Sequence, residues 1–453
     1  MTIPCVLKIQ AQANTGRGKG ATGQGSIICR ASGARFCRRL RLLHRRTALL
    51  IIASHADRYG HGKLPERTGD LFRPHQQRVL PSDETMLIKG YATTEGTARY
   101  RDRFAGRAAQ NHFRNQQNLL LSSIGIGTYL GQPNATTDQA YEDAIVHAAR
   151  SGVNVIDSAA NYRFQRSERN IGAALQKLTN DLGFSRDEFL ICTKGGYLPF
   201  DGAPPRDVRA YVEETFVKPG IANFDDIVGG SHCMTPAYLQ NQLDQSRTNL
   251  GVECIDVYYI HNPESQLGYM SEAEFYDRLR VAFETLETNR ERGALRMYGV
   301  ATWNGFRVPA DTADFHSLNR MVKIAEDLAG EHHGFRFIQL PYNLAMPEAL
   351  TLANHTNKKD HASVLEAAAS LGITAVASAS LLQGRVARGL PDALRKSLGS
   401  LATDAQAAIQ FVRSTPGITT ALVGMSNADH VEENLQLVDI QPLDKEQFAA
   451  LMG

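Results

Sequence analysis

From residue 119 to residue 453 the sequence predicts an α/β fold, a (β/α)8 TIM barrel. Eight short apolar or β-branched runs alternate with longer segments of helical periodicity, which is the pattern of repeated β-α units around a parallel sheet. This segment also exceeds the roughly 250 residues of a typical barrel, which leaves room for an enlarged loop after the third strand.

The predicted strands and helices alternate in strict order. The strands are 123–128, 153–157, 189–194, 255–261, 297–301, 335–340, 374–379 and 420–424. The helices are 138–149, 167–178, 236–250, 272–288, 317–329, 362–371, 404–412 and 428–438. Because a helix follows each strand, the strands run parallel and their C-terminal ends meet at one mouth.

A doubly wound nucleotide-binding sheet is the alternative to the barrel. It requires G-x-G-x-x-G between its first strand and first helix. Gly125, Gly127 and Gly131 have one residue too many before the third glycine, and Pro133 follows instead of a helix. The barrel is therefore favoured.

The enlarged loop spans 197–235, between the third strand and its helix. It is rich in proline and glycine. Because βα loops open on the face where barrels place their active sites, we expect this loop to border a substrate pocket.

Residues 1–85 differ in composition from the rest of the chain. They carry 15 Lys and Arg against 5 Asp and Glu, whereas the whole chain has a net charge of +2. We interpret them as a basic, disordered extension, with an organellar transit peptide or a mis-assigned start before Met86 as the other interpretations. Residues 86–118 are predicted to be a loosely structured lead-in, with the folded domain starting near Leu119.

Composition restricts partners and compartment. The small net charge gives no reason to expect nucleic acid or a membrane surface as a partner, and the longest apolar run, 48–53, is far below the ~20 residues that cross a bilayer. The six cysteines have neither CxxC spacing nor a neighbouring His pair that would indicate zinc. We expect reduced thiols, no metal and a cytoplasmic location, or an organellar one if residues 1–85 are a transit peptide.

Four ionisable residues lie at or just after predicted strand ends. Asp157, Lys194 and His261 end the second, third and fourth strands, and Tyr162 follows Asp157 by five residues. Each alone has an ordinary explanation, such as capping or packing.

Together, these four residues can transfer a proton. A phenol with a pKa near ~10 is a weak acid, but a neighbouring ammonium lowers that pKa. Lys194 could supply the ammonium, Asp157 its counter-ion, and His261 a hydrogen bond to a carbonyl oxygen. Protonating an oxygen that becomes an alkoxide is half of carbonyl reduction, and the hydride for the other half implies a nicotinamide cofactor.

The stretches around these residues resemble the aldo/keto reductase family. The matching segments are 152–162, 167–172, 193–194, 255–263 and 424–434. The resemblance implies a (β/α)8 barrel, NADPH as the hydride donor (NADH possible), and reduction of an aldehyde or ketone to an alcohol. It assigns the catalytic positions to Asp157, Tyr162, Lys194 and His261, with Tyr162 as the general acid.

The resemblance also implies a cofactor-binding set. Its members are Gln339 for the nicotinamide amide, Ser378, Leu381 and Gly384 after the seventh strand, and Gly424, Ser426, Asn427, His430, Glu433 and Asn434 for the 2′-phosphate and adenine. A helix N-terminus with Ser and Asn offers donors to a phosphate, and an ordinary helix cap is the alternative interpretation. His430 stands where many members have Arg, a stronger phosphate partner, so the choice between NADPH and NADH stays open.

Two positions depart from the family pattern. Ala301-Thr302 replaces the Ser-Asn pair that binds the carboxamide, and Ser378 replaces the tyrosine that stacks on the nicotinamide. Trp303, the only tryptophan, or Tyr197 could take the stacking position. Losing these contacts is expected to weaken cofactor binding by about 1–3 kcal/mol, which is tenfold to a hundredfold, without removing the proton chemistry.

An NAD(P)H-dependent reductase of a small-molecule carbonyl is thus the leading hypothesis. The alternative is a non-catalytic nicotinamide-nucleotide-binding sensor or regulatory barrel subunit. A metal hydrolase is disfavoured because the pairs His332-His333 and His355/His361 lie in polar segments, interpreted as solvated surface. The loops identify neither the carbonyl substrate nor the oligomeric state.

Overall fold

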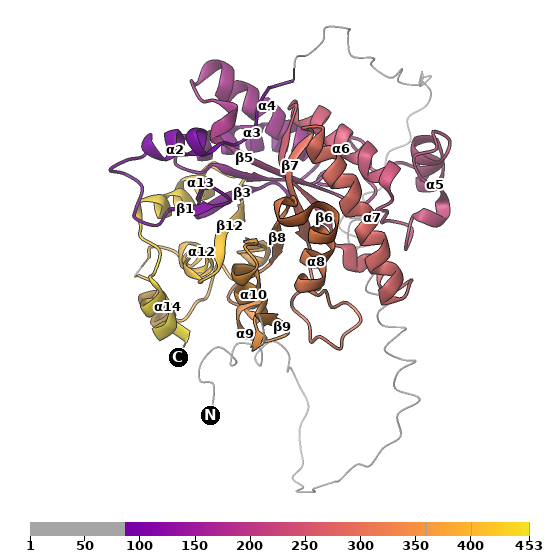
Figure 1. The fold of residues 1–453 in the computed structure, drawn as a ribbon. Coiled ribbons are helices and arrows are strands. Elements are labelled where there is room, and N and C mark those ends of the chain that lie inside the picture. The colour runs from indigo at the N-terminus through magenta and orange to yellow at the C-terminus, as the bar shows by residue number, and fades with distance from the viewer. Residues whose placement is uncertain (1–86, 358–359, 400, 453) are drawn as a thin grey trace, which may run out of the picture. The chain divides into compact units, whose positions relative to one another are not determined.

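Eight parallel strands close into a barrel in the computed structural model of the protein (Figure 1). The structure describes residues 87–357, 360–399 and 401–452. In chain order the barrel strands are β3 (Ile124–Gly127), β4 (Val155–Asp157), β5 (Leu190–Gly195), β6 (Ile255–His261), β7 (Leu295–Ala301), β8 (Phe335–Pro341), β11 (Thr374–Ser378) and β12 (Ile418–Gly424). Strand β12 pairs with β3, which closes the ring. The predicted fold and its eight strands are confirmed.

Helices cover the outside of the barrel. After successive strands come α3 (Ala135–Arg150), α4 (Arg166–Asp181), α6 (Pro236–Leu250), α7 (Glu272–Glu291), α8 (Leu318–Ala329), α10 (Val364–Ser370), α12 (Asp404–Ser414) and α13 (Ala428–Leu435). Local signals set their ends. Ser271 and Glu274 form a capping box at the start of α7, and Gly251, at φ +65°, ends α6 in the left-handed conformation that glycine tolerates.

Shorter helices and strands are added to the eight β-α units. They are α2 (Thr94–Asp102), β1 (Phe113–Gln116), β2 (Leu119–Ser122), α5 (Val208–Val212), α9 (Glu348–Thr351), β9 (His355–Asn357), β10 (Asp360–Ala362), α11 (Asp392–Ser397) and α14 (Lys445–Met452). Among the helices that the structure describes, none is both long and apolar enough to cross a bilayer.

Strand alternation divides the core into two layers. In β6, Val257 and Tyr259 belong to the cluster inside the barrel, whereas Tyr258 and Ile260 pack outward under the helices. Successive side chains of a strand point to opposite faces, so every second residue faces the barrel axis. The inner cluster also includes Leu119 and Leu121 of β2, so the hairpin β1-β2 contributes to the packing inside the barrel.

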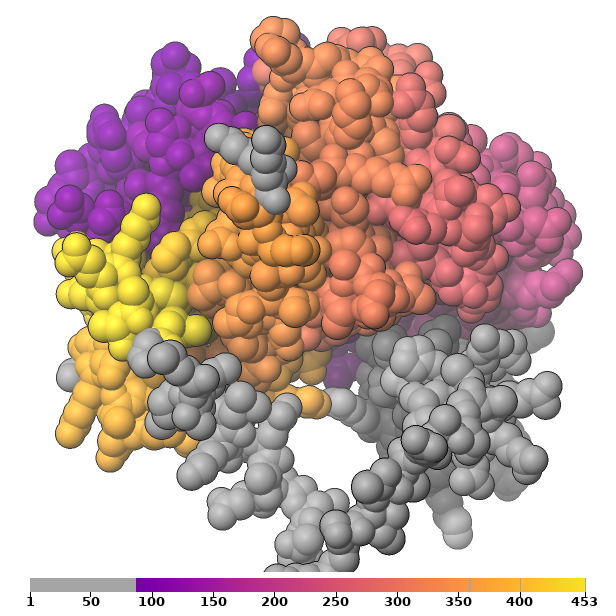
Figure 2. Space-filling view, turned by 60° about the horizontal axis from the view of Figure 1, so that its bottom comes forward, coloured from indigo at the N-terminus to yellow at the C-terminus, as the bar shows by residue number. Residues whose placement is uncertain are grey.

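The predicted loose lead-in at 86–118 and the predicted domain start near Leu119 are wrong for the residues that the structure describes. Helix α2 buries Tyr100 completely, and the Tyr100 hydroxyl donates a hydrogen bond to Ala149 O at 2.6 Å. Ala109 N also donates to Val438 O at 2.9 Å, and the indigo N-terminal and yellow C-terminal parts of the fold accordingly lie side by side (Figures 1 and 2). The expectation for residues 1–85 falls outside the described part of the chain.

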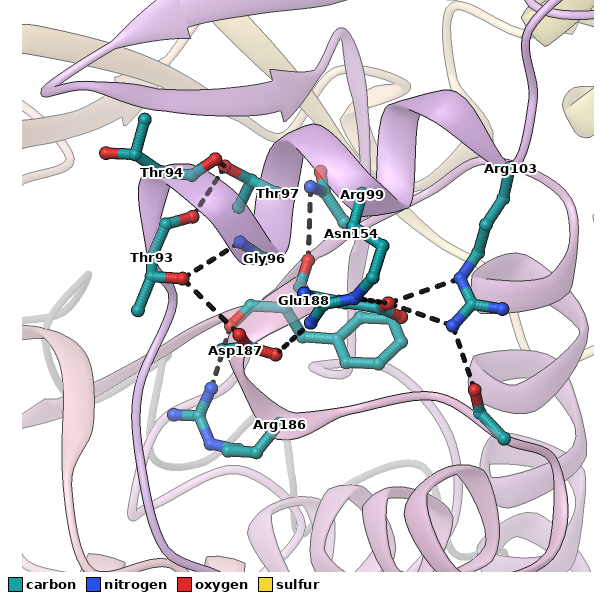
Figure 3. Close-up of polar contacts among 12 residues, drawn as sticks. Thr93, Thr94, Gly96, Thr97, Arg99, Arg103, Asn154, Arg186, Asp187 and Glu188 are labelled. Atoms are coloured by element: carbon teal, nitrogen blue, oxygen red, sulfur yellow. Dashed lines mark hydrogen bonds and ion pairs between the residues drawn. The ribbon is translucent and has the colours of Figure 1, made fainter.

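Charge pairing explains why the sequence of α2 was misleading. Arg99 and Arg103 each lie 2.9 Å from the carboxylate of Glu188, whose side chain is fully buried (Figure 3). Thr93 caps the helix by accepting from Gly96 N. The segment is polar because it docks through ion pairs and caps, and hydrophobic periodicity does not reveal such contacts.

The enlarged loop, residues 197–235, forms a small core together with Tyr238 of α6. Helix α5 continues into a π-helical turn at 213–217. The core cluster comprises Leu198, Val212, Phe216, Ala222, Ile227, Cys233 and Tyr238. Backbone hydrogen bonds join the two ends of the loop, from Leu198 N to Ser231 O at 2.9 Å and from Cys233 N to Gly196 O at 2.8 Å. The loop is therefore an ordered insertion.

Candidate active site

Strand alternation brings the predicted strand-end residues together at the mouth. Asp157, Lys194, His261 and Gln339 each follow an inner-cluster residue by two positions, and so they face the barrel axis one layer above that cluster. All four are buried. Tyr162, in the loop after β4, keeps part of its side chain accessible.

The Lys194 ammonium sits between fixed oxygens. Its Nζ lies 2.6 Å from Asp157 Oδ2 and donates to Ser158 O, also at 2.6 Å. The other carboxylate oxygen, Asp157 Oδ1, accepts from Gln339 Nε2 at 2.8 Å. Burial lowers the pKa of Lys194, but Asp157 and Tyr162 raise it by more, so the pKa lies above its ordinary value and the amine stays charged.

Tyr162 lies beside this charge. Lys194 Nζ is 4.8 Å from the centre of its ring, and the His261 ring centre is 5.8 Å away. Burial raises the pKa of Tyr162, and the nearby Lys194 charge lowers it without reversing the shift. The expected lowering by Lys194 is thus present, but the expectation of a net lowered pKa was wrong because it left out burial.

His261 is a neutral imidazole at the mouth. Burial, the Lys194 charge and His232 lower its pKa well below the ordinary value. Its Nδ1 is buried and has no hydrogen-bond partner among the described residues. The Tyr197 ring packs edge-on against the His261 ring, with centres 5.1 Å apart. A neutral imidazole can donate one hydrogen bond to a substrate oxygen.

The turn after Tyr162 is strained. Arg163, Phe164 and Gln165 have φ of +47°, +59° and +69°, the left-handed region that costs a non-glycine residue roughly 1–2 kcal/mol. Arg163 and Arg166 both pair with Asp138 of α3, and Arg163 also donates to Asn170 Oδ1 at 2.9 Å. No feature of the sequence predicted this strained turn or its ion pairs with Asp138, since left-handed turns usually contain glycine.

The segment after β11 has an unusual backbone and an unpaired polar atom. Ser378 ends the strand half-buried, and Ala379, Leu382 and Gln383 have positive φ. Ser380 Oγ is buried without a partner among the described residues. Leu381 packs on the core, and a Cβ added at Gly384, which has φ +80°, would meet no atom within 4 Å.

The β12-α13 segment combines a capped helix with accessible positions. Asn427 caps α13 by accepting from Asp429 N and His430 N at 2.9 and 3.2 Å, as in the alternative interpretation of an ordinary cap. Gly424 and His430 are exposed, and Ser426 is half-buried. Glu433 accepts from Thr403 Oγ1. Asn434 Oδ1 is buried without a partner among the described residues.

The sequence did not indicate a role for Glu264. This residue contacts Thr302, which belongs to the Ala301-Thr302 pair that departs from the family pattern. The Thr302 hydroxyl donates to Glu264 Oε1 at 2.8 Å, and the same oxygen accepts from Trp303 N and Asn304 N at 2.6 and 3.0 Å. Trp303 itself is 45% exposed. Tyr197, the other stacking candidate, is packed against His261 instead.

Each of the two predicted cofactor segments contains a buried polar atom that has no partner among the described residues. The unpaired Ser380 Oγ and Asn434 Oδ1 lie in different segments, and buried polar atoms normally have partners. The amide nitrogen of Gln339, the residue predicted to bind the nicotinamide amide, already donates a hydrogen bond to Asp157.

The histidines considered for a metal site are not all at the surface. His333 and His355 are buried rather than solvated, and His355 contacts Asn354 Oδ1 and His316 O at 2.7 and 3.1 Å. His355 is buried because the hairpin β9-β10, in which it lies, packs on α8 and α10. The described residues contain no group of three or more potential ligands arranged around a metal.

Comparison with known proteins places these residues within one family. The model of the Aldo/keto reductase family matches residues 123–453. The NADH-specific methylglyoxal reductase of Escherichia coli is 27% identical over 189 residues, which are 41% of this chain and 49% of that protein. The D-threo-aldose 1-dehydrogenase of a Pseudomonas species is 27% identical over 160 residues, 35% of this chain and 43% of that protein. The chain thus spans about half the length, or less, of these curated relatives.

Solved structures of the family share the fold. An aldo-keto reductase of Bacillus halodurans in its holo form has a TM-score of 0.51 and 18% identity, covering 74% of this chain and 93% of that one. An aldo/keto reductase of Klebsiella pneumoniae in complex with NADP and acetate has a TM-score of 0.50 and 20% identity, covering 76% and 94%. At these identities the likeness concerns the fold alone.

Proposed function

Because the chain belongs to the aldo/keto reductase family, we propose that it is an NAD(P)H-dependent oxidoreductase that reduces an aldehyde or ketone to an alcohol. The observation that carries this proposal is the buried Lys194 ammonium, held 2.6 Å from Asp157 and 4.8 Å from the centre of the Tyr162 ring. A charge held in this way stabilises a phenolate at the end of proton transfer.

The proposed proton chemistry uses four side chains. Tyr162 Oη gives its proton to the substrate oxygen, and the Lys194 ammonium stabilises the phenolate that forms. Asp157 keeps Lys194 charged and in place, and neutral His261 donates a hydrogen bond to the same substrate oxygen. When bound, a nicotinamide nucleotide would supply the hydride for the carbonyl carbon, which would complete the reduction to the alcohol and leave the nucleotide oxidised.

The proposed cofactor site combines two segments. Gln339 with residues 378–384 would hold the nicotinamide half, and residues 424–434 the adenosine half. Both donors are proposed, because the Escherichia coli relative is named as NADH-specific and the Klebsiella pneumoniae structure holds NADP. The Asp429 carboxylate in the first turn of α13 repels a phosphate. The exposed His430 attracts a phosphate less than an Arg at that position would.

The test is oxidation of NADPH and of NADH by the full chain over a panel of aldehydes, ketones and dicarbonyls, beside Tyr162→Phe. We expect turnover of at least one carbonyl and a loss of about a hundredfold or more in kcat for Tyr162→Phe, because general acid catalysis contributes about 10²–10⁴-fold. Nucleotide binding without turnover of any carbonyl would favour the non-catalytic sensor, and retention of kcat in Tyr162→Phe would refute Tyr162 as the acid.

A further inference from the structure

The ends of the insertion 197–235 close directly against the catalytic strand β6. His232, near the second end of the insertion, is fully buried, and its Nε2 lies 2.7 Å from the backbone oxygen of His261. Gly196, at φ +135°, leaves room for this contact, since a Cβ there would lie 2.8 Å from His232 Nε2 and 3.2 Å from His261 O. Tyr197, at the first end, packs edge-on against both His232 and His261.

The directions of the hydrogen bonds around His232 follow from the donors and acceptors that its neighbours carry. Arg278 only donates, so Gln266 turns its Oε1 to Arg278 Nη1, at 3.3 Å. The amide nitrogen of Gln266 therefore faces His232 Nδ1 at 3.1 Å and donates to it. His232 then carries its proton on Nε2 and donates to His261 O. Burial lowers the pKa of His232 to about 4, so the ring is neutral and carries a single proton.

The orientation of His261 depends on contacts from neighbouring residues, because its ring has no hydrogen bond at Nδ1 among the described residues. The contacts that hold the residue are the hydrogen bond from His232 to its backbone oxygen and the edge-on packing of the Tyr197 and Tyr162 rings against its imidazole. The Tyr197 hydroxyl is in turn fixed by Ser265 Oγ at 2.8 Å.

We propose that His232 and Tyr197 are positioning residues, supplied by the insertion, that set the orientation of the His261 imidazole at the barrel mouth. On this proposal the insertion determines where the hydrogen bond to the substrate oxygen points. The catalytic part of this inference rests on the proposed function. The orientation of His261 can be measured without it.

The experiment compares two buried histidines of the full chain. His112 is a matched control, because it is also fully buried and its Nε2 contacts a backbone oxygen, Gly152 O, at 2.8 Å. The variants are His232→Leu, His232→Gln and His112→Leu. Glutamine carries both a donor and an acceptor, so His232→Gln can keep the bonds to His261 O and Gln266.

Two readouts are followed, the imidazole NMR resonances of His261, assigned with His261→Gln, and the steady-state kinetics. In His232→Leu we expect the His261 resonances to shift or broaden, and kcat to fall by about tenfold to a hundredfold with a smaller change in KM. His232→Gln should restore the wild-type resonances and bring kcat to within about threefold of wild type, and His112→Leu should leave both readouts unchanged.

The outcomes separate the two proposals. Unchanged His261 resonances in His232→Leu, or equal changes in His112→Leu, would overturn the positioning role. If the wild-type protein turns over no carbonyl, the proposed function fails, and the resonances still test the orientation of His261. If His232→Leu does not fold, Tyr197→Leu gives the same test through the ring contact, with the same resonances as the readout.

Discussion

Lys194 Nζ and Asp157 Oδ2 lie 2.6 Å apart at the C-terminal ends of neighbouring strands, with both side chains buried. The pairing of β4 with β5 sets this distance, since Asp157 is in register with Cys192, two residues before Lys194. Both side chains face the barrel axis, so both charges are shielded from bulk water. The pair is therefore a structural element as well as part of the proposed catalytic set.

Asp157→Asn is expected to destabilise the protein by about 3–5 kcal/mol, because it leaves the Lys194 charge buried without its counter-ion. The free energy of unfolding in urea measures the effect. Lys194→Met combined with Asp157→Asn should recover part of the loss, since the unpaired charge is then removed. If Asp157→Asn alone is as stable as wild type, Asp157 is not the counter-ion that the buried Lys194 charge requires.

Above neutral pH, kcat should stay level up to about pH 10, because burial raises the pKa of Tyr162 above its ordinary value of 10.0. The sign follows from the role of the residue, since a proton donor is active below its pKa and loses activity above it. The measurement is kcat with saturating cofactor across this range. A fall in kcat centred between pH 7 and about 9 would contradict either the raised pKa or the assignment of the acid.

Arg163→Ala should destabilise the protein more than Arg163→Gly, by about 1 kcal/mol. Both variants lose the contacts to Asp138 and Asn170, but only glycine relieves the left-handed φ of +47°. Urea unfolding midpoints measure the difference.

Lys177, exposed in the middle of α4, is the control for this pair of variants. In a helix the order reverses, and Lys177→Gly should be less stable than Lys177→Ala by about 1 kcal/mol. The same order at both positions would argue against a strained turn at 163–165.

His430→Arg should increase the affinity for NADPH relative to NADH by about tenfold, because a guanidinium at the start of α13 pairs with a 2′-phosphate better than a neutral imidazole does. Isothermal titration calorimetry with NADPH and with NADH measures the affinity for each nucleotide. Asp429→Asn should change the ratio in the same direction by a smaller factor. An unchanged ratio in both variants would place the 2′-phosphate elsewhere.

The barrel and its proposed proton-transfer residues could be predicted from the order of the amino acids. Short apolar runs and helical periodicity are local properties, and a closed parallel sheet brings the ends of its strands together at one mouth. Asp157, Lys194 and His261 could therefore be grouped without coordinates.

The surroundings of those residues became visible in the folded chain. Gln339 reaches Asp157 across 182 residues of sequence, and Arg99 reaches Glu188 across 89. The net pKa shift of Tyr162 depends on burial, and the support of His261 depends on where an insertion folds back. Such contacts join distant segments of the chain, whereas a periodic pattern reports only which face of one segment is apolar.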